Sequence, residues 1–263
     1  MAKDIKQRLD AALEICTSAG ELALEKFINL ESLSVEKKGV QDLVSEADRE
    51  VELLIRDNLT KRFPDDGLIG EEFENKEPGN SPYSWIIDPI DGTANYLRGI
   101  SVWAVVLACV DEEATQIGVV YDPVHQEMFY ACNGFGSYKN GQPNIPYGPD
   151  GLHDGLVGIG TSTKGSKEPI INLIADLLSK DGIFCRSGSG ALGITYVSCG
   201  RYIGFLESHM NAWDCLAAML IVEEAGGKVI GLNLPDMIAN GGKAIVASPS
   251  VVKEIVNISK HIL

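Results

Sequence analysis

The stretch at residues 85–96 decides the fold, and it reads Trp85-Ile86-Ile87-Asp88-Pro89-Ile90-Asp91-Gly92-Thr93-Ala94-Asn95-Tyr96. Its apolar start predicts a short buried strand. Proline has no N–H and a fixed φ, so we expect the chain to leave its hydrogen-bonded ladder at Pro89 and turn. Gly92 and Thr93 can open a helix, whose first N–H groups attract anions. The stretch therefore predicts two carboxylates, those of Asp88 and Asp91, for a hard cation beside donors for a phosphate, which is how proteins usually hold Mg²⁺.

The same residues have an ordinary alternative, because Asp-Pro and Asp-Gly pairs also form acidic surface turns. The order of the string, a buried strand followed by Asp, Pro, an apolar residue, Asp, Gly, Thr and then Asn, favours a site. It resembles the signature of the inositol monophosphatase family of Mg²⁺-dependent, Li⁺-sensitive phosphatases. Phosphatases of the haloacid dehalogenase type are a second candidate, but one residue separates their two aspartates, whereas two residues separate Asp88 and Asp91. This spacing favours metal-activated water over an aspartate nucleophile.

The composition is that of a globular protein and limits the partners. The chain has 263 residues, of which 45% are hydrophobic and 22% charged, enough for one large domain or two lobes that share a core. The formal net charge is −15 at pH 7. Contacts with nucleic acid need clustered Lys and Arg, so this charge argues against direct binding of nucleic acid. It would also repel a small phosphorylated substrate unless metal ions reverse the local field.

Cysteine usage and hydropathy indicate the compartment. Six cysteines are scattered without a CxxC pair or a histidine at zinc-ligand spacing, so we expect buried free thiols in a reducing compartment. No run approaches the roughly 18 consecutive apolar residues of a membrane span, and the charged N-terminus lacks an apolar signal segment. We therefore expect a cytoplasmic protein that does not associate with membranes.

Helix and strand patterns alternate along the chain and predict layered sheets with helices between and outside them. Gly and Pro are concentrated at residues 141–155, which we take as the boundary between an N-terminal α+β lobe, residues 1–148, and a C-terminal α/β lobe, residues 149–263. Helical periodicity predicts helices at residues 4–27, from the segment 42–48 that leads into a helix as far as Pro64, and at 169–178, 189–200, 213–225 and 250–262. Strand patterns lie at residues 68–72, 85–87, 101–110, 115–121, 127–132, 136–139, 156–160, 202–206 and 244–247. Residues 33–41 read as a strand edge or a mobile loop.

Two further acidic motifs extend the resemblance. Gly70-Glu71-Glu72 matches the family's Gly-Glu-Glu motif, whose first glutamate binds metal, although the pair alone also fits a solvated acidic turn. Trp213-Asp214, an apolar helix and then Glu224-Ala225-Gly226-Gly227 match the family's second signature. Asp214 alone also fits a helix N-cap.

The resemblance implies a set of metal ligands. Asp88, Asp91 and Asp214 would share one cation, and Asp88, Glu71 and the Ile90 carbonyl another. Two such cations can clamp the attacking and leaving oxygens of an in-line displacement.

The resemblance also implies the groups that assist the attacking water. The Thr93 hydroxyl would lie between Asp48 and the water, so that Thr93, Asp48 and Glu71 are the predicted catalytic residues. A mobile loop that carries Lys37 and Asp42 would help to place a third, weaker metal, and spacing does not distinguish Lys37 from Lys38.

The predicted substrate contacts come from two sources, the donor groups at a helix start and the family resemblance. The N–H groups of Gly92 and Thr93 at the predicted helix start would bind phosphate. By resemblance, Glu207 would hydrogen-bond a substrate hydroxyl, and the turn at residues 188–191 would contact the sugar ring. The predicted contacts on the second lobe are therefore Ser189, Gly190, Ala191, Glu207 and Asp214. The turn also fits a helix N-terminus capped by Ser189.

Taken together, the resemblance implies an α/β (α+β) fold, a layered αβαβα sandwich of the sugar-phosphatase type. It also implies a homodimer and two or three Mg²⁺ ions per active site. The implied reaction is hydrolysis of a phosphomonoester, with inositol monophosphate as the default substrate. Histidinol phosphate and sugar phosphates such as fructose 1,6-bisphosphate are alternatives. A regulatory binding protein is the alternative from another class, because some bacterial relatives associate with transcription machinery.

Overall fold

The computed structural model describes residues 3–30, 35–39, 42–161 and 166–262. Its helices are α1 (Lys3–Ile28), α2 (Glu46–Arg62), α3 (Thr93–Tyr96), α4 (Glu168–Leu178), α5 (Gly190–Ser198), α6 (Ala212–Glu224), α7 (Leu234–Asn240) and α8 (Val252–Ser259), with a 3₁₀ turn at Pro249–Val251. Its strands are β1 (Val35–Gly39), β2 (Asp42–Ser45), β3 (Gly67–Gly70), β4 (Ser84–Asp91), β5 (Ala104–Val110), β6 (Thr115–Asp122), β7 (Glu127–Cys132), β8 (Ser137–Lys139), β9 (Gln142–Pro143), β10 (Leu156–Ile159), β11 (Ile183–Cys185), β12 (Gly204–Met210), β13 (Lys228–Val229) and β14 (Gly242–Ala247).

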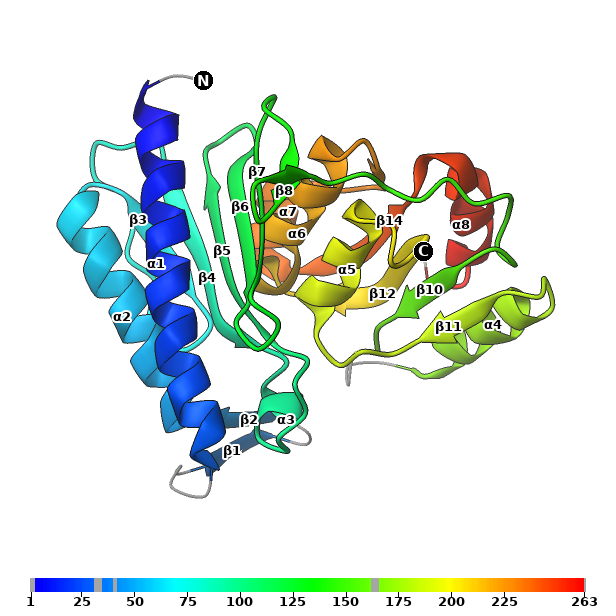
Figure 1. The fold of residues 1–263 in the computed structure, drawn as a ribbon, viewed down its shortest axis with the longest axis horizontal. Helices are drawn as coiled ribbons and strands as arrows, with labels where there is room; N and C mark the ends of the chain where they lie inside the picture. The colour runs from blue at the N-terminus through cyan, green and yellow to red at the C-terminus, as the bar shows by residue number, and fades with distance from the viewer. Residues whose placement is uncertain (1–2, 31–34, 40–41, 162–165, 263) are drawn as a thin grey trace.

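Helices and two large sheets alternate in five layers (Figure 1). α1 and α2 cover the outer face of a seven-stranded sheet, and α5 and α6 lie between this sheet and a five-stranded one. α4 and α8 cover the outer face of the five-stranded sheet. The predicted αβαβα sandwich is therefore confirmed.

The seven-stranded sheet has the order β3-β4-β5-β6-β7-β8-β9, and β3 and β4 are its parallel pair. Successive side chains of a strand point to opposite faces. Val105 and Leu107 of β5 accordingly join the core under α1 and α2, whereas Val106 and Ala108 join the core under α5 and α6. Because helices bury both faces, this strand is apolar at every position.

The helix α6 joins the two halves of the chain. The five-stranded sheet has the order β11-β10-β12-β14-β13, and α6 packs between it and β6 of the other sheet. At Gly118 of β6 the approach is close, since a Cβ there would lie 2.4 Å from the Ala217 carbonyl oxygen. Residues 215–222 are all buried, as expected for a helix in a middle layer. This helix belongs to the second half of the chain but packs in the core of the first half. The division into two lobes between residues 148 and 149 stays a prediction.

Several element predictions need correction. The strand predicted at residues 202–206 lies at Gly204–Met210 instead, and β2, β9, β11, β13 and α7 were not predicted. Residues 35–39 form β1, which pairs with β2, while the rest of the predicted segment at 33–41 falls outside the described residues.

A buried ion pair fixes α1 against the start of β3 and β4. Arg8 donates from Nη2 to Asp66 Oδ1 at 2.8 Å and from Nε to Oδ2 at 3.1 Å. The indole N–H of Trp85, at the start of β4, donates to the same carboxylate at 2.9 Å. The Arg8 guanidinium lies over the rings of Phe63 and Tyr83 at 4.6 and 4.3 Å. This network lies at the end of β3 opposite to Glu71.

Two broader expectations can be compared with the structure. All six cysteines are free thiols, four of them buried and two partly buried. Among the helices of the described ranges, none has the length and apolar character needed to span a membrane.

Candidate metal centre

The strand β4 brings both aspartates of the central motif to one face of the sheet. Its pairing with β5 places Asp88 opposite Val106 and Asp91 opposite Ala104, so β4 carries one extra residue between these pairs. The prediction that the chain leaves the ladder at Pro89 is therefore wrong, because the pairing resumes after this bulge. Residues three apart on a regular strand point to opposite faces, and the extra residue re-aims Asp91 to the side of Asp88.

Asp214 reaches the same place from the start of α6. The N-cap is Asn211, and Asp214 is the third helical residue, so the N-cap alternative for Asp214 is corrected. The two residues form a capping box in which Asp214 Oδ2 accepts the Asn211 backbone N–H at 2.9 Å. This contact fixes the carboxylate at the tip of the helix.

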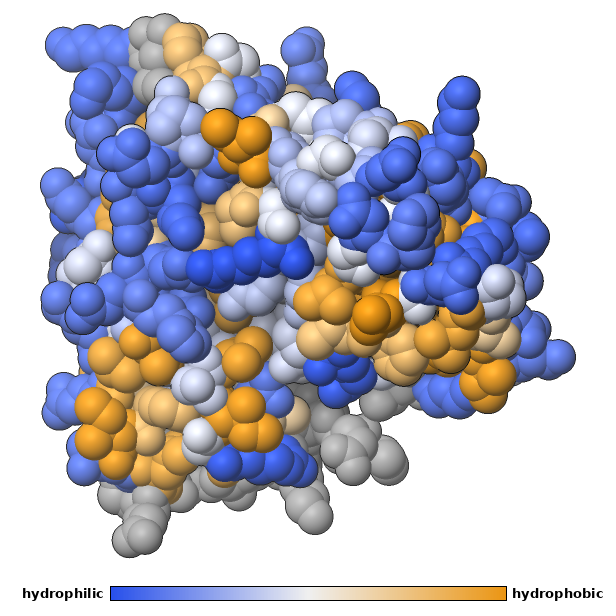
Figure 2. All heavy atoms as spheres, turned by 45° about the vertical axis from the view of Figure 1, so that its right-hand side comes forward, coloured by the Kyte–Doolittle hydropathy of each residue, from blue (hydrophilic) through white to orange (hydrophobic). Residues whose placement is uncertain are grey.

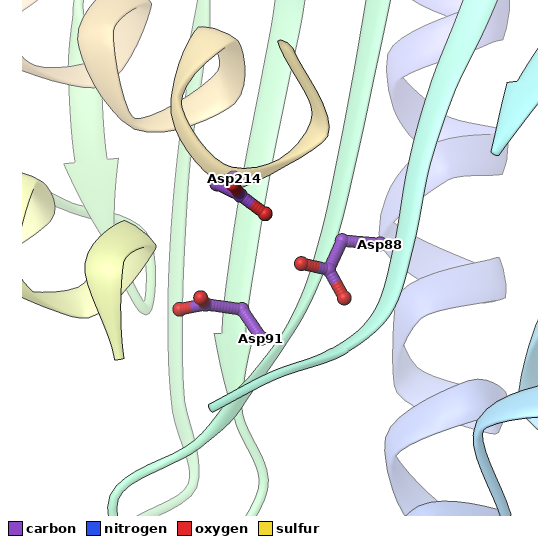
Figure 3. A group of neighbouring side chains, drawn as sticks. All are labelled: Asp88, Asp91 and Asp214. Atoms are coloured by element: carbon purple, nitrogen blue, oxygen red, sulfur yellow. The ribbon is translucent and has the colours of Figure 1, made fainter. Parts of the chain in front are cut away.

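The carboxylates of Asp88 and Asp214 face each other, and that of Asp91 lies beside them and is directed away from Asp88 (Figure 3). The potential ligand oxygens of the three residues lie within 4.8 Å of one another. Burial, followed by the charges of Glu71, Asp91 and Asp214, raises the pKa of Asp88 well above its ordinary value. Burial and the Asp91 charge raise the pKa of Asp214 to about 7. Burial raises the pKa of Asp91 to about 6, although hydrogen bonds from Ser189 and the start of α5 lower it. A divalent cation would relieve both the desolvation and the repulsion.

Glu71 belongs to the same edge of the sheet. It follows β3, which is parallel to β4, so the ends of both strands reach this edge together. Glu71 is the largest charge contribution to the raised pKa of Asp88. The structure therefore places a fourth carboxylate within electrostatic range of the cluster.

The N-terminus of α5 holds Asp91 from the other half of the chain. The Ser189 hydroxyl and the Ala191 N–H, the latter at 2.9 Å, donate to Asp91 Oδ2, and the Gly190 N–H donates to Oδ1 at 3.2 Å. Ser189 is also the N-cap of α5 and accepts the Leu192 N–H, as the alternative for this turn predicted. Contact of these three residues with substrate stays a prediction.

Thr93 and Asp48 come together although they are far apart in sequence. Thr93 Oγ1 lies 3.2 Å from Asp48 Oδ1 and 3.0 Å from the Ile90 carbonyl oxygen. Asp48 is 1% exposed, in the first turn of α2. Thr93 begins α3, a helix of four residues whose N-cap, Gly92, has a φ of 97° that favours glycine.

A pocket of about 180 Å³ opens beside the carboxylate cluster. Its walls come from β10, β12 and the turn before α5, and they include the predicted residues Ser189, Gly190 and Glu207. The lining residues that sequence reasoning missed include Ile159, Gly160, Thr161, Arg186, Ser187 and Phe205. No motif marks them, since the turns and the long β12 strand that gather them are features of the tertiary fold.

Glu207 is the acidic group on the far wall of this pocket. It packs on Gly160, where a Cβ would lie 1.9 Å from Glu207 Oε2. Burial and the charges of Asp214 and Asp91 raise its pKa to about 8, against the opposing effect of Arg186. The Arg186 Nε donates to Thr161 Oγ1 at 3.1 Å.

For some predicted residues the structure gives the backbone position but does not test the role. The backbones of Lys37 and Asp42 belong to β1 and β2, but their side chains are outside what the structure describes. Their role near a third cation stays a prediction. Gly92 and Thr93 lie at the start of α3, and their role in binding phosphate is a prediction too.

Comparison with known proteins adds an independent observation. The model of the inositol monophosphatase family matches residues 4–261. The chain belongs to the inositol monophosphatase family. Family membership and the acidic cluster support a metal-dependent phosphatase.

Relatives within this family carry different names. The histidinol-phosphatase of Chlorobaculum parvum is 37% identical over 83% of each chain, and the Nus factor SuhB of Pseudomonas aeruginosa is 35% identical over 84% of each chain. The fructose-1,6-bisphosphatase/inositol-1-monophosphatase of Aquifex aeolicus is 32% identical over 92% of this chain and 94% of its own. The crystal structure of extragenic suppressor protein suhB from Bartonella henselae has a TM-score of 0.90 at 27% identity, over 97% of this chain and 98% of that one. These names leave the substrate open.

The chemistry of the donor set fits a hard divalent cation. The convergent ligands are carboxylate oxygens, which Mg²⁺ prefers, rather than the thiolate and imidazole groups typical of zinc sites. The raised pKa values of Asp88, Asp91 and Asp214 show that the hydrogen bonds they accept do not offset their burial and mutual repulsion.

We expect Mg²⁺ to stabilise the protein more at about pH 8 than at about pH 5.5. Asp91 and Asp214 have folded-state pKa values of about 6 and about 7, above the value of about 4 in an unfolded chain. Between about pH 4 and pH 7 the folded protein thus binds more protons than the unfolded chain. Without a cation, the stability that this cluster contributes falls as the pH rises through that range. At one fixed Mg²⁺ concentration, equal to 100 times the Kd at pH 8, the ion would add about 2.7 kcal/mol at pH 8 and less at pH 5.5, where protons compete with it for the carboxylates. Thermal unfolding with and without Mg²⁺ at both pH values measures the effect, and an equal shift at both would contradict it.

Proposed function

We propose that this protein is a Mg²⁺-dependent phosphomonoester hydrolase whose preferred substrate is inositol monophosphate. The observation that carries the proposal is the convergence of Asp88, Asp91 and Asp214, from both halves of the chain, beside a polar pocket. Membership of a phosphatase family supports the reaction class.

The carboxylates divide between two cation positions in this proposal. Asp88, Asp91 and Asp214 hold one Mg²⁺, and Asp88, Glu71 and the Ile90 carbonyl hold the other. Bound Mg²⁺ supplies positive charge to the phosphoryl oxygens and lowers the pKa of water.

Thr93 and Asp48 orient the attacking water. The Thr93 hydroxyl has one proton, which it donates to Asp48 Oδ1 or to the Ile90 carbonyl. Its oxygen therefore keeps a lone pair that accepts a hydrogen bond from water. Asp48 is buried and fixed in the first turn of α2. A proton of the water can therefore pass to the Thr93 oxygen as the Thr93 proton passes to Asp48. The water oxygen bonds to phosphorus, the bond between phosphorus and the alcohol oxygen breaks, and solvent protonates the departing alkoxide.

The pocket receives the alcohol part of the substrate. The N–H groups of Gly92 and Thr93 hold the phosphate, and Glu207, Thr161 and Ser187 supply hydrogen-bonding groups on the wall. Such a wall suits a ring with several hydroxyl groups. Histidinol phosphate and fructose 1,6-bisphosphate are the alternatives, because relatives of similar identity carry those names.

Phosphate release from a panel of substrates tests the proposal. The panel holds inositol 1-phosphate, histidinol phosphate, fructose 1,6-bisphosphate and 3′-phosphoadenosine 5′-phosphate. We expect turnover that depends on Mg²⁺, is inhibited by Li⁺ and is fastest with inositol 1-phosphate. Asp91→Asn removes a charge that the cation needs and should lower kcat by about a thousandfold, or about 4 kcal/mol.

Three outcomes would contradict the proposal. Fastest turnover of another compound would reassign the substrate, and full activity of Asp91→Asn would remove the assigned metal position. Absence of turnover on the whole panel by folded protein would favour a regulatory binding protein, the second candidate. That candidate rests on the 35% identity to a protein named Nus factor SuhB.

Substitution of Glu207 tests the pocket wall. Glu207→Ala should raise KM for inositol 1-phosphate by about fivefold near pH 7, because Glu207, with a pKa of about 8, is largely protonated there, and a neutral hydrogen bond contributes about 1 kcal/mol. The KM for p-nitrophenyl phosphate, which has no ring hydroxyls, should be unchanged. Glu223→Ala is the control, since Glu223 is an exposed glutamate in the last turn of α6, at the end of the helix opposite to the pocket. Equal losses on both substrates would show that Glu207 supports the fold instead.

We also propose a homodimer that uses the end of the molecule carrying α4 and β11. Figure 2 shows apolar surface gathered there, and Ile171, Leu178, Ile183 and Phe184 are 61, 52, 58 and 40% exposed. β11 is an end strand of its sheet, and exposed apolar edges are characteristic of interfaces.

Light scattering tests the dimer. We expect twice the chain mass of 28.3 kDa for the wild type and a single chain mass for Ile183→Glu. Ile28→Glu is the control, because Ile28 is 73% exposed at the end of α1. A monomeric wild type, or an Ile183→Glu variant that still dimerises, would contradict the proposed interface.

A further inference from the structure

One face of α2 lies against the ends of β3 and β4, at the edge of the sheet that carries the candidate metal centre. Asp48, Glu52 and Arg56 are spaced four residues apart and therefore lie on the same side of the helix. Asp48 reaches Thr93. Glu52 has no exposed surface at all, yet it is a carboxylate that the mechanism above does not use.

Glu52 binds the chain directly after β3. Its Oε2 accepts the backbone N–H of Glu72 at 2.9 Å, and its Oε1 accepts the Arg56 Nε at 2.6 Å. Arg56 continues along the same segment, because its Nη1 donates to the Glu74 carbonyl at 3.1 Å and its Nη2 to the Phe73 carbonyl at 3.3 Å. The pair thus holds the backbone of three consecutive residues.

Glu52 also contacts the residue before Glu71. A Cβ at Gly70 would lie 2.1 Å from Glu52 Oε1 and 2.7 Å from Arg56 Nη2, so only glycine allows this approach. Glu71 lies between Gly70, which packs on the Glu52 carboxylate, and Glu72, whose N–H is bonded to it. The backbone on both sides of Glu71 is therefore held by one buried side chain.

We propose that Glu52 is a positioning residue that fixes the direction of Glu71 for cation binding. This inference rests on the proposed function, in which Glu71 is a metal ligand. A buried ion pair is a weak source of stability, since well-packed apolar residues of similar volume stabilise a fold as well. An apolar residue at position 52 could not accept the Glu72 N–H. Groups that orient metal ligands typically affect metal affinity by about 10- to 100-fold.

A double-mutant cycle on the full chain tests the proposal. Mg²⁺ affinity is measured by titration calorimetry for the wild type, Glu52→Gln, Glu71→Gln and the double variant, after circular dichroism has shown that each is folded. We expect Glu52→Gln to weaken Mg²⁺ binding by about tenfold and Glu71→Gln by at least as much. If Glu52 acts through Glu71, the double variant binds no more weakly than Glu71→Gln alone.

Asp66→Asn is the matched control. Asp66 is a carboxylate with 1% exposure that pairs with an arginine, at the opposite end of the same strand. The substitution Asp66→Asn should lower the midpoint of thermal unfolding and leave Mg²⁺ affinity unchanged. If Glu52→Gln does not fold, Arg56→Lys takes its place, because lysine keeps the charge beside Glu52 but cannot reach both carbonyls.

The outcomes separate this inference from the proposed function. Wild-type affinity of Glu52→Gln beside a defective Glu71→Gln would overturn the positioning role alone. So would additive losses in the double variant, or an equal loss in Asp66→Asn. Wild-type affinity of Glu71→Gln would overturn the ligand role of Glu71, and with it this inference.

Discussion

The mutual repulsion of three buried carboxylates is the constraint on which the rest of this structure depends. Asp88, Asp91 and Asp214 offer oxygens within 4.8 Å of one another, where water cannot screen their charges fully. A buried carboxylate is unfavourable unless a partner compensates it. The fold brings these three together from distant parts of the chain, and their arrangement is best explained by a cation between them.

Each of these carboxylates is oriented by main-chain donors. Asp88 accepts the Ile90 N–H in the bulge of β4, and Asp214 accepts the N–H of Asn211 in the capping box. Asp91 accepts two N–H groups at the start of α5. Backbone donors orient a carboxylate without neutralising it, so the site keeps its negative charge for a metal. The layered sandwich is what allows a strand end and two helix starts to meet.

Sequence reasoning predicted the layers and the members of the site better than it predicted their geometry. The motifs around Asp88, Asp91 and Asp214 identified the carboxylates because their order along the chain matches the family's signatures, although each aspartate alone also fits an acidic turn or a helix cap. The bulge at Pro89 was missed, since the choice between a turn and a resumed ladder depends on β5, a non-local partner. The position of Asp214 in its helix depended on whether Asn211 or Asp214 caps it, and both residue types fit a cap.

The pocket wall lay largely beyond prediction for a different reason. Thr161 and Arg186 occur in polar turns with no motif of their own, and they become neighbours only when β10 and β11 pair in parallel. Glu52 carries no signal either, because a glutamate in an amphipathic helix normally faces solvent. Long-range pairing, rather than local propensity, decides all three positions.

The contact between Asp91 and the start of α5 links two equilibria. Asp91 belongs to the first sheet, whereas its donors Ser189, Gly190 and Ala191 belong to the helix that packs on the second. A cation on Asp91 competes with these donors for the same oxygens. By thermodynamic reciprocity, any shift of α5 that weakens these hydrogen bonds changes the affinity for the cation, and the bound cation changes the energy of that shift by the same amount. In such an arrangement the packing of α5 would act as an effector of the ion that the carboxylates of both halves would share.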